Sequence, residues 1–396
     1  MWLKNEITSL VEKDIDRESI YVFSFIAVVF LGYLETTTFT EFVPRHLIDQ
    51  LTYVVLLFPL FKLFFLDNYK ISKKIVIISI LLLSIISWKK AGSNVLFVMT
   101  VMILSAQGVS FNKLIKYYFY ITLILFIATI FYSLLGIIQN LVYQRGNVYR
   151  YSFGINYPTD FAAHIFSLCL AYCYLHFNKL KFSSYIFFFL LAFVVNFISN
   201  ARLSMITVLL IIPVMLVAQA AERKNRICRI IASFYWTSIP ILGFIAGYAA
   251  YFYTPSNHLY MHFNNLLSGR LQYSKIGFDQ YGFSWFGNRV IEHGWGSVNG
   301  HYMMGHAADQ YFYLDSSYIR LMILFGLLMG IWILGVAVTI SLTEIKHRHY
   351  VLPAVIFLLS ISSLIDQHFL ELAYNPFLIA LLASRNVIGE DNIKYE

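Results

Sequence analysis

The sequence predicts an all-α polytopic membrane protein, and three observations support that fold class. Of the 396 residues, 59% are hydrophobic and only 13% are charged. The mean hydropathy is +0.67, so the chain carries more apolar surface than one soluble domain can bury. Apolar runs of about 16 to 25 residues recur along the chain, and a helix needs roughly 20 residues to cross a bilayer. The spans should be helical, because lipid offers backbone polar groups no other partner.

We expect about twelve spans within one integral membrane domain that covers residues 1–396. They are expected at residues 19–35, 47–66, 74–88, 93–110, 116–138, 158–177, 183–199, 203–220, 231–252, 316–341, 351–366 and 369–386. Residues 1–18 are charged and lack a small-residue cleavage site, so they are expected to stay as a cytoplasmic tail. This tail is either an amphipathic surface helix or a solvated segment. Residues 387–396 are expected to form a cytoplasmic C-terminal tail.

Basic residues alternate along these spans, so the net charge of +8 indicates orientation in the membrane rather than nucleic-acid binding. With a cytoplasmic N-terminus, the connections on the inside are short and basic, and the basic density outside is roughly a third of the inside value. The inside connections hold Lys70, Lys73, Lys74, Lys113, Lys116, Lys179, Lys181, Arg223, Lys224, Arg226, Arg229, Lys346 and Arg348. Both the span count and the orientation follow from this alternation.

Two outside segments, at 139–157 and 253–315, are longer than a connector requires. The second lies between spans nine and ten and holds five of the eleven histidines. Long loops without a function are uncommon, so we expect a partly helical functional element there. The two halves of the chain show no internal repeat, which a duplicated transporter would carry.

Among the arginines in outside segments, Arg150, Arg202 and Arg270 are the candidates for a functional site. Arg202 lies in "FISNARLSMITV", and a turn arginine that reaches for the interface is its ordinary alternative. Arg270 follows Gly269 in "NNLLSGRLQYSKIGF" and projects beside Tyr273, where a solvated loop arginine is the alternative. Together the three guanidinium groups could converge on one anion, because a guanidinium binds phosphate oxygens with two parallel hydrogen bonds.

Arg150 precedes the sixth span in "NVYRYSFGINYPTDF". There Asn156, Pro158 and Asp160 are typical of a helix start, with Asn156 as the cap. That account explains Pro158 and Asp160 but leaves Arg150 without a role.

Proton acceptors are fewer. Asp315 in "YFYLDSSYIRLMILFGLLMG" stands at the start of the tenth span, with Arg320 inside the apolar run, and a helix N-cap is its competing role. Glu371 and Asn375 lie within the twelfth expected span, where an intramembrane carboxylate is a functional candidate or pairs structurally with Arg320. Further candidates on the outside are Glu35, Glu41, Asp160, Asp309, His301 and His306.

Several chemistries are excluded by the motifs. The chain has no P-loop and no HExxH zinc motif, and His301 and His306 are wrongly spaced for one helix face. Asp14 and Asp16 form the only D-x-D, which is more typical of a solvated tail than of a nucleotide-sugar site. The three cysteines form no disulfide framework. We therefore expect neither a metal nor another cofactor.

Five separated pieces of the chain resemble Wzy-type polysaccharide polymerases, which are relatives of the O-antigen ligases. In order they are "RYSFGINYPTDF", "SNARLS", "SGRLQYSKIGFDQYGFSWFGNR", "LDSSYIRLMILFGLLMG" and "HFLELAYNPFL". They cover about residues 150–380, whereas the first 140 residues match only in hydropathy. Ligases of the related family carry a histidine where this chain has Asp315, which disfavours the ligase.

The resemblance implies a GT-C-like glycosyltransferase in the bacterial cytoplasmic membrane, with both termini cytoplasmic. It would polymerise polyprenyl (undecaprenyl) diphosphate-linked oligosaccharide repeat units on the outer face, giving O-antigen, capsule or exopolysaccharide. The partners would be lipid-linked donor and acceptor glycans, membrane lipid, a flippase and a chain-length regulator, and no nucleic acid. Arg150, Arg202 and Arg270 would engage the donor diphosphate.

The expected catalytic residues are Asp315, as the general base, with Arg270 and Arg202. The expected substrate-binding residues are Arg150, Asp160, Tyr273, Arg320, His301, Glu371 and Asn375. Two alternatives stay open from the residues alone: a lipid-linked oligosaccharide flippase or transporter, which suits twelve spans equally well, and an O-antigen ligase-type glycan transferase.

Overall fold

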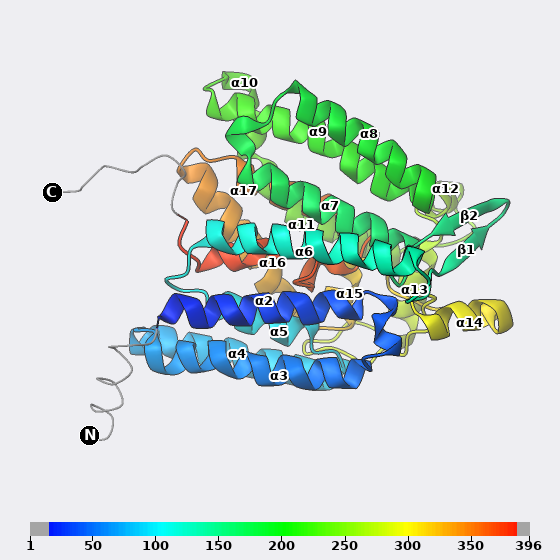
Figure 1. Cartoon of the computed structure of the whole chain (residues 1–396), viewed down its shortest axis with the longest axis horizontal. Helices are drawn as coiled ribbons and strands as arrows, with labels where there is room; N and C mark the ends of the chain where they lie inside the picture. The colour runs from blue at the N-terminus through cyan, green and yellow to red at the C-terminus, as the bar shows by residue number, and fades with distance from the viewer. Residues whose placement is uncertain (1–15, 386–396) are drawn as a thin grey trace.

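The computed structural model describes residues 16–385 as a bundle of long helices that run side by side (Figure 1). Most of the N-terminal tail expected at 1–18, including Asp14, and the C-terminal tail expected at 387–396 lie outside the described residues. The first described helix begins and the last described turn ends at the same end of the bundle. A small hairpin lies at the other end, which we call the hairpin end.

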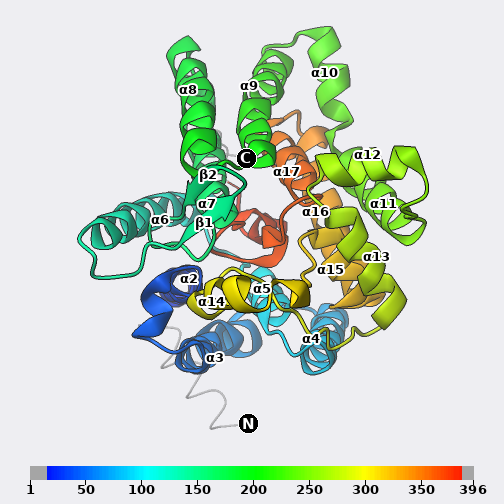
Figure 2. The ribbon, with the colours of Figure 1, turned by 90° about the vertical axis from the view of Figure 1, so that its right-hand side faces the viewer.

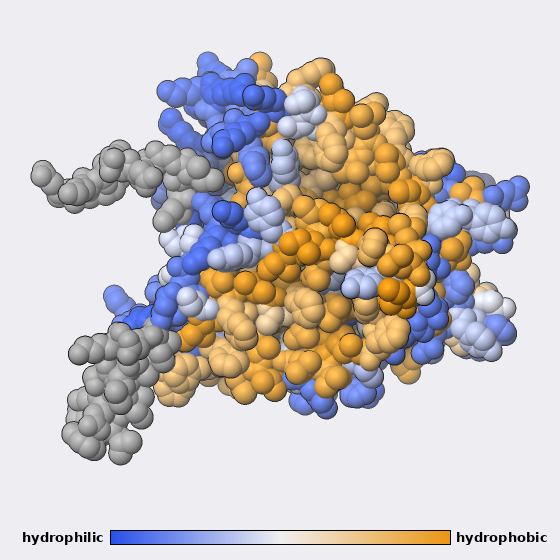
Figure 3. Space-filling model, in the orientation of Figure 1, coloured by the Kyte–Doolittle hydropathy of each residue, from blue (hydrophilic) through white to orange (hydrophobic). Residues whose placement is uncertain are grey.

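Eight helices within residues 16–385 are long and apolar enough to cross a membrane. They are α2 (Arg17–Glu35), α3 with its π-helical continuation η2 (Arg45–Leu66), α4 (Ile71–Ala91), α6 (Phe111–Leu134), α8 (Phe182–Ser199), α9 (Arg202–Glu222), α10 to α11 (Arg226–Tyr251) and α16 (Leu327–Lys346). Apolar residues cover the middle of the bundle and polar residues gather at its two ends (Figure 3). The expected all-α polytopic membrane protein is therefore confirmed at this level.

Two shorter apolar helices, α5 (Val95–Leu104) and α17 (Val351–Ser362), occupy expected spans. The span expected at 93–110 is thus only ten residues of helix. Helix α7 (Pro158–Leu175) is buried on nearly every side, so it is the central helix of the bundle. Pro158 and Asp160 stand in its first turn as expected, but Tyr157 is the cap. Asn156 instead donates from Nδ2 to the Glu35 backbone oxygen at 2.7 Å.

The span expected at 316–341 is broken into two helices, α15 (Ser317–Ile323) and α16. Gly326 separates them with φ of +90°. A Cβ atom at Gly326 would stand 2.4 Å from the Gly287 nitrogen, so only glycine allows the two backbones to approach this closely. The break brings residues 284–288 of the long loop against the start of α16, where Leu327 donates its backbone N–H to the Ser284 oxygen at 2.9 Å.

The expectation of a membrane-spanning helix at residues 369–386 is wrong. After α17, residues 363–385 form two 3₁₀ turns, η6 (His368–Leu370) and η7 (Phe377–Leu381), joined by turns. We call residues 363–385 the floor segment. Its middle is almost completely buried, and irregular backbone is tolerated at membrane depth only where protein or a water-filled cavity surrounds it. The segment ends near the start of α6, where Phe111 donates its backbone N–H to Ser384 at 2.9 Å.

The two long segments expected outside the membrane form the hairpin end (Figures 1 and 2). The first contains the antiparallel hairpin of β1 (Val142–Arg145) and β2 (Val148–Tyr151). The second contains α12 (His258–Leu266), α13 (Arg270–Tyr281), α14 (Val298–His306) and the turn η5 (Ala308–Gln310). Three further turns, η1 (Thr38–Glu41), η3 (Phe177–Lys179) and η4 (Tyr235–Thr237), connect helices elsewhere. The expectation of a partly helical element at 253–315 is confirmed.

Replacing Asn375 by alanine should destabilise the floor segment. The fully buried Asn375 side chain donates to the Phe369 oxygen at 2.7 Å and accepts from the Phe377 nitrogen at 3.2 Å. Leaving both backbone groups unpaired should cost about 1–3 kcal/mol for each. A clearly lower melting temperature of the purified protein in detergent is expected. Asn178→Ala, at an exposed amide on η3, is the control and should melt like the unchanged protein; equal melting of both variants would contradict this role.

Candidate functional site

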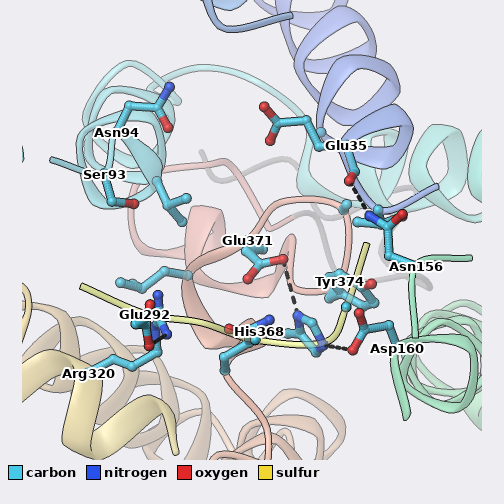
Figure 4. A pocket seen from close by; sticks show the side chains of 18 of the residues that line it. Glu35, Ser93, Asn94, Asn156, Asp160, Glu292, Arg320, His368, Glu371 and Tyr374 are labelled. Atoms are coloured by element: carbon cyan, nitrogen blue, oxygen red, sulfur yellow. Dashed lines mark hydrogen bonds and ion pairs between the residues drawn. The ribbon is translucent and has the colours of Figure 1, made fainter. Parts of the chain in front are cut away.

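A cavity of about 650 Å³ lies among the helices near the hairpin end. Its wall combines α2, α3, the α4–α5 connection, the start of α7, the loop of residues 290–315 and the floor segment. Figure 4 shows that side chains from these distant parts of the chain point into one space. Five candidate residues that the sequence singled out line it: Glu35, Asp160, Asp315, Arg320 and Glu371.

Arg270 and Asp315 form an ion pair at the edge of the cavity. Gly269 adopts φ of +87°, which lets α13 begin at Arg270. The Arg270 Nε atom lies 3.5 Å from Asp315 Oδ2 and donates to the Ile365 oxygen at 2.9 Å. Asp315 is not the cap of α15, because Ser316 occupies that position. The helix-cap alternative is therefore wrong, and the carboxylate is free to face the cavity.

Burial and charge act in opposite directions on this pair. Burial raises the pKa of the Asp315 carboxyl, and the Arg270 guanidinium partly offsets that rise. Burial opposes the charge of Arg270, but Asp315 and Asp366 outweigh it and hold the pKa of the guanidinium above its usual value. Arg270 is therefore a permanent cation.

The other two arginines do not line the cavity. Arg150, on β2, is only 6% exposed. Its Nε donates to the Ser199 oxygen at 2.7 Å, and its guanidinium carbon lies 5.4 Å from the centre of the Tyr157 ring. Arg202 is exposed at the first position of α9. Tyr157 does line the cavity, so it stands between Arg150 and that space.

The positive charges of these arginines affect the pKa values of neighbouring groups. The pKa of Arg145 is lowered first by burial and then by the positive charges of Arg150, Arg202 and Arg270. Burial raises the pKa of the Tyr157 phenol, while Arg150 and Arg270 lower it. We call Arg145, Arg150, Arg202 and Arg270 the arginine group. Within this group only Arg270 contacts a carboxylate of the cavity wall, and Arg202 is exposed. The convergence of Arg150, Arg202 and Arg270 on one anion stays a prediction.

A histidine that the sequence reasoning missed connects two of the predicted carboxylates. His368 Nε2 lies 3.3 Å from Asp160 Oδ1, and its Nδ1 lies 3.1 Å from Glu371 Oε2 (Figure 4). Its ring stacks on Tyr374 with centroids 3.8 Å apart. The spacing of His368 and Glu371 was visible in the sequence, but nothing local pairs them with Asp160 on α7. The cluster fixes both carboxylates against the floor of the cavity.

Arg320 pairs with Glu292, the second residue that the sequence reasoning missed. Its Nη1 lies 2.7 Å from Glu292 Oε1, and that carboxylate also accepts from the Leu314 nitrogen at 3.0 Å. The guanidinium carbon lies 5.3 Å from the centre of the Tyr313 ring. Arg320 is thus held in place by protein groups on the cavity wall, as its structural alternative proposed, although with Glu292 as the partner.

The remaining predicted site residues lie away from the cavity. His301 Nε2 lies 2.9 Å from the Val142 oxygen and thereby holds α14 against the hairpin. Asn375 is buried in the floor segment, as described above. Tyr273 packs on Tyr311 with ring centroids 5.0 Å apart, so it supports a residue of the wall.

Aromatic rings make up much of the remaining wall. They belong to Tyr53, Trp88, Tyr157, Trp295, Tyr311, Tyr313 and Tyr374. The wall therefore offers flat apolar faces next to many hydrogen-bond acceptors. Among residues 16–385, no group of three or more His, Cys, Asp or Glu side chains is arranged to hold a metal ion.

Comparison with known proteins gives no match: no family, no curated protein and no solved structure is detectably similar to the chain. The interpretation of the site therefore depends on its residues and geometry.

Replacing Arg320 by methionine should leave Glu292 unpaired inside the cavity wall. Breaking such a pair is destabilising by up to about 3 kcal/mol when little solvent reaches it. The double variant Arg320→Met/Glu292→Gln should recover much of the loss, because glutamine is neutral and still accepts from Leu314. Melting temperatures in detergent test this, and a double variant no more stable than Arg320→Met would show that the ion pair is not what Arg320 contributes.

Proposed function

We propose that the protein is a membrane glycosyltransferase of the Wzy type. It would join polyprenyl diphosphate-linked oligosaccharide repeat units into a cell-surface polysaccharide, on a GT-C-like fold. The observation that carries the proposal is the cavity, lined by carboxylates and aromatic rings, with the arginine group beside it. Carboxylates accept hydrogen bonds from sugar hydroxyls, and aromatic faces cover the apolar faces of sugar rings.

The arginine group supplies what the leaving group needs. Cleavage of the bond between sugar and diphosphate releases a polyprenyl diphosphate, on which negative charge develops. Fixed guanidinium groups stabilise such charge without reorganising. Arg270 is the member at the cavity edge, whereas Arg202 is exposed. A diphosphate held among these arginines would place its first sugar toward the cavity.

Asp315 is the proposed general base. It lines the cavity and lies beside Arg270, so it would stand near the sugar carbon that is attacked. The acceptor hydroxyl attacks that carbon, the carboxylate takes the hydroxyl proton, and the diphosphate leaves with the bonding electrons. The lipid-linked donor already carries the activated bond between sugar and diphosphate, so the reaction requires no nucleotide.

The orientation follows from charge. The end of the bundle opposite the hairpin carries the dense basic connections, so the hairpin end would be extracytoplasmic and both termini cytoplasmic. The enzyme would then act at the outer face of a bacterial cytoplasmic membrane, on lipid-linked donor and acceptor glycans. A flippase would supply the repeat units from the inner face.

One reconstitution tests the proposal against its rivals. Purified protein is incubated with polyprenyl diphosphate-linked repeat units, and the products are separated by size. A ladder of polymers supports the polymerase. Transfer only to a different acceptor would identify a ligase, and movement of the intact lipid across a vesicle membrane without transfer would identify a flippase.

Arg270→Lys should lower the polymerisation rate by about 10²- to 10³-fold, because lysine keeps the charge but loses the two parallel hydrogen bonds to a diphosphate. The product ladder is compared at equal protein amount. The control is Arg226→Lys, an exposed arginine at the opposite end of the bundle, which should polymerise normally. Normal ladders from Arg270→Lys would contradict diphosphate binding at this residue.

Asp315→Asn should slow polymerisation by about 10²- to 10⁴-fold if the carboxylate is the base, and this loss should remain in protein that is still folded at the assay temperature, although the unpaired Arg270 lowers the melting temperature. The pH profile gives a second test. The base must be ionised, so activity should fall as pH drops through its raised pKa.

Arg270 should set the pH at which the activity falls. Arg270 lowers the pKa of Asp315, so Arg270→Gln should raise that pKa and move the acid limb of the residual activity to higher pH. Arg270→Lys keeps the charge and should leave the limb in place. Identical acid limbs in Arg270→Gln and Arg270→Lys would assign the proton acceptor to another group.

A further inference from the structure

The cavity has a charge opposite to that of the protein as a whole. The chain carries a net charge of +8. The cavity wall nevertheless holds seven carboxylates against only Arg45, Arg320 and His368. The carboxylates belong to Glu35, Asp49, Asp160, Glu292, Asp315, Asp366 and Glu371. A ligand that enters this space meets a strongly negative wall.

Six of these seven carboxylates have a partner within the protein. Asp160 and Glu371 share His368, Glu292 pairs with Arg320, and Asp315 pairs with Arg270. Asp49 accepts from the Asn94 amide, and Asp366 accepts from the Ser362 hydroxyl. Glu35 is different: within the described part of the chain, its carboxylate has neither a hydrogen bond nor an ion pair.

Asn156 fixes the backbone of Glu35 at the cavity wall. Asn156 is 4% exposed and lines the cavity, and its Oδ1 atom is buried with no hydrogen-bond partner. Its Nδ2 atom donates to the backbone oxygen of Glu35 at 2.7 Å, so the two residues are fixed side by side (Figure 4). Buried acceptors are normally paired, because an unpaired one costs free energy.

We propose that Glu35, held in place by Asn156, forms a subsite for a sugar residue that donates hydrogen bonds and carries no negative charge. An amino sugar fits best, since its ammonium group supplies both hydrogen-bond donors and a positive charge that compensates the Glu35 carboxylate. A neutral sugar fits next, through its hydroxyls. An acidic sugar would bring a carboxylate against Glu35 and the other cavity carboxylates, and it would be rejected.

The subsite is built from other elements than the proposed reacting centre. Asp315 and Arg270 lie where the loop of residues 290–315 meets the floor segment, whereas Glu35 ends α2 and Asn156 precedes α7. The pair therefore selects the glycan rather than the leaving group. This inference rests on the proposed function, because it assumes that the cavity receives sugar, and it names the charge class of that sugar.

Binding of three oligosaccharides to the purified full chain in detergent tests the subsite. The probes are β-1,4-linked tetramers of glucosamine, glucose and glucuronate, which share one backbone and differ in charge. Titration calorimetry at neutral pH should rank glucosamine above glucose, with glucuronate at least about tenfold weaker than glucose. Glucuronate binding as tight as glucose, or no binding of any tetramer, would overturn the proposal.

The variant Glu35→Gln keeps the size of the side chain and removes its charge. It should reduce the advantage of glucosamine over glucose by about tenfold and strengthen glucuronate binding. Glu41→Gln, at an exposed carboxylate on η1, is the matched control and should keep the ranking of the unchanged protein. An unchanged order of affinities in Glu35→Gln would show that Glu35 does not determine selectivity for the charge of the sugar.

The ladder assay separates this inference from the proposed function. Polymerisation with a reversed binding order would keep the polymerase and remove the subsite. The expected order without any polymerisation would keep the sugar subsite and remove the polymerase.

Discussion

The structure depends on how the backbone N–H and C=O groups of one non-helical stretch find hydrogen-bond partners inside a membrane bundle. Lipid cannot pair exposed N–H and C=O groups, so irregular backbone survives there only when protein or water surrounds it. The floor segment meets this condition because α2, α6, α7 and α16 enclose it and Asn375 pairs its backbone. The floor segment also supplies Asp366, His368 and Glu371 to the cavity wall. The polar part of that wall therefore depends on the stretch that follows the end of α17.

The second organising principle is the separation of charge. Positive groups gather around Tyr157 at the hairpin end, and negative groups line the cavity behind that residue. The Arg270–Asp315 pair joins the two regions. In a low-dielectric setting such fixed charges act strongly and need not reorganise during a reaction. In the proposed reaction, an anionic leaving group and a hydroxyl-rich glycan would each find a complementary region, and the pair would stand near the bond that is broken.

Long apolar helices such as α2, α8 and α9 could be predicted, because their composition alone excludes other structures in lipid. The span at 369–386 could not, since an apolar run that is buried on all sides carries no period that distinguishes a helix from two 3₁₀ turns. For the site, residue type in an apolar context was enough to select Asp160, Asp315, Arg320 and Glu371. It could not find His368 or Glu292, because their partners come from distant segments. The same reasoning misplaced His301 and Asn375, whose polar groups bind backbone instead. Both side chains could bind a ligand by residue type, but in the structure their polar atoms contact backbone groups.

The loop that carries α14 is attached to the hairpin by few contacts. Tyr143 donates its hydroxyl to the Trp295 oxygen at 2.8 Å, and His301 contacts the Val142 oxygen. The helices beneath are held by a continuous buried core. Because segments with few buried contacts open at lower free energy than a core does, α14 should separate from the hairpin more readily than the bundle unfolds. If the proposed polymerisation takes place in this 650 Å³ space, a product too long for it would leave past α14, and the size of the cavity would not limit the length of the polymer.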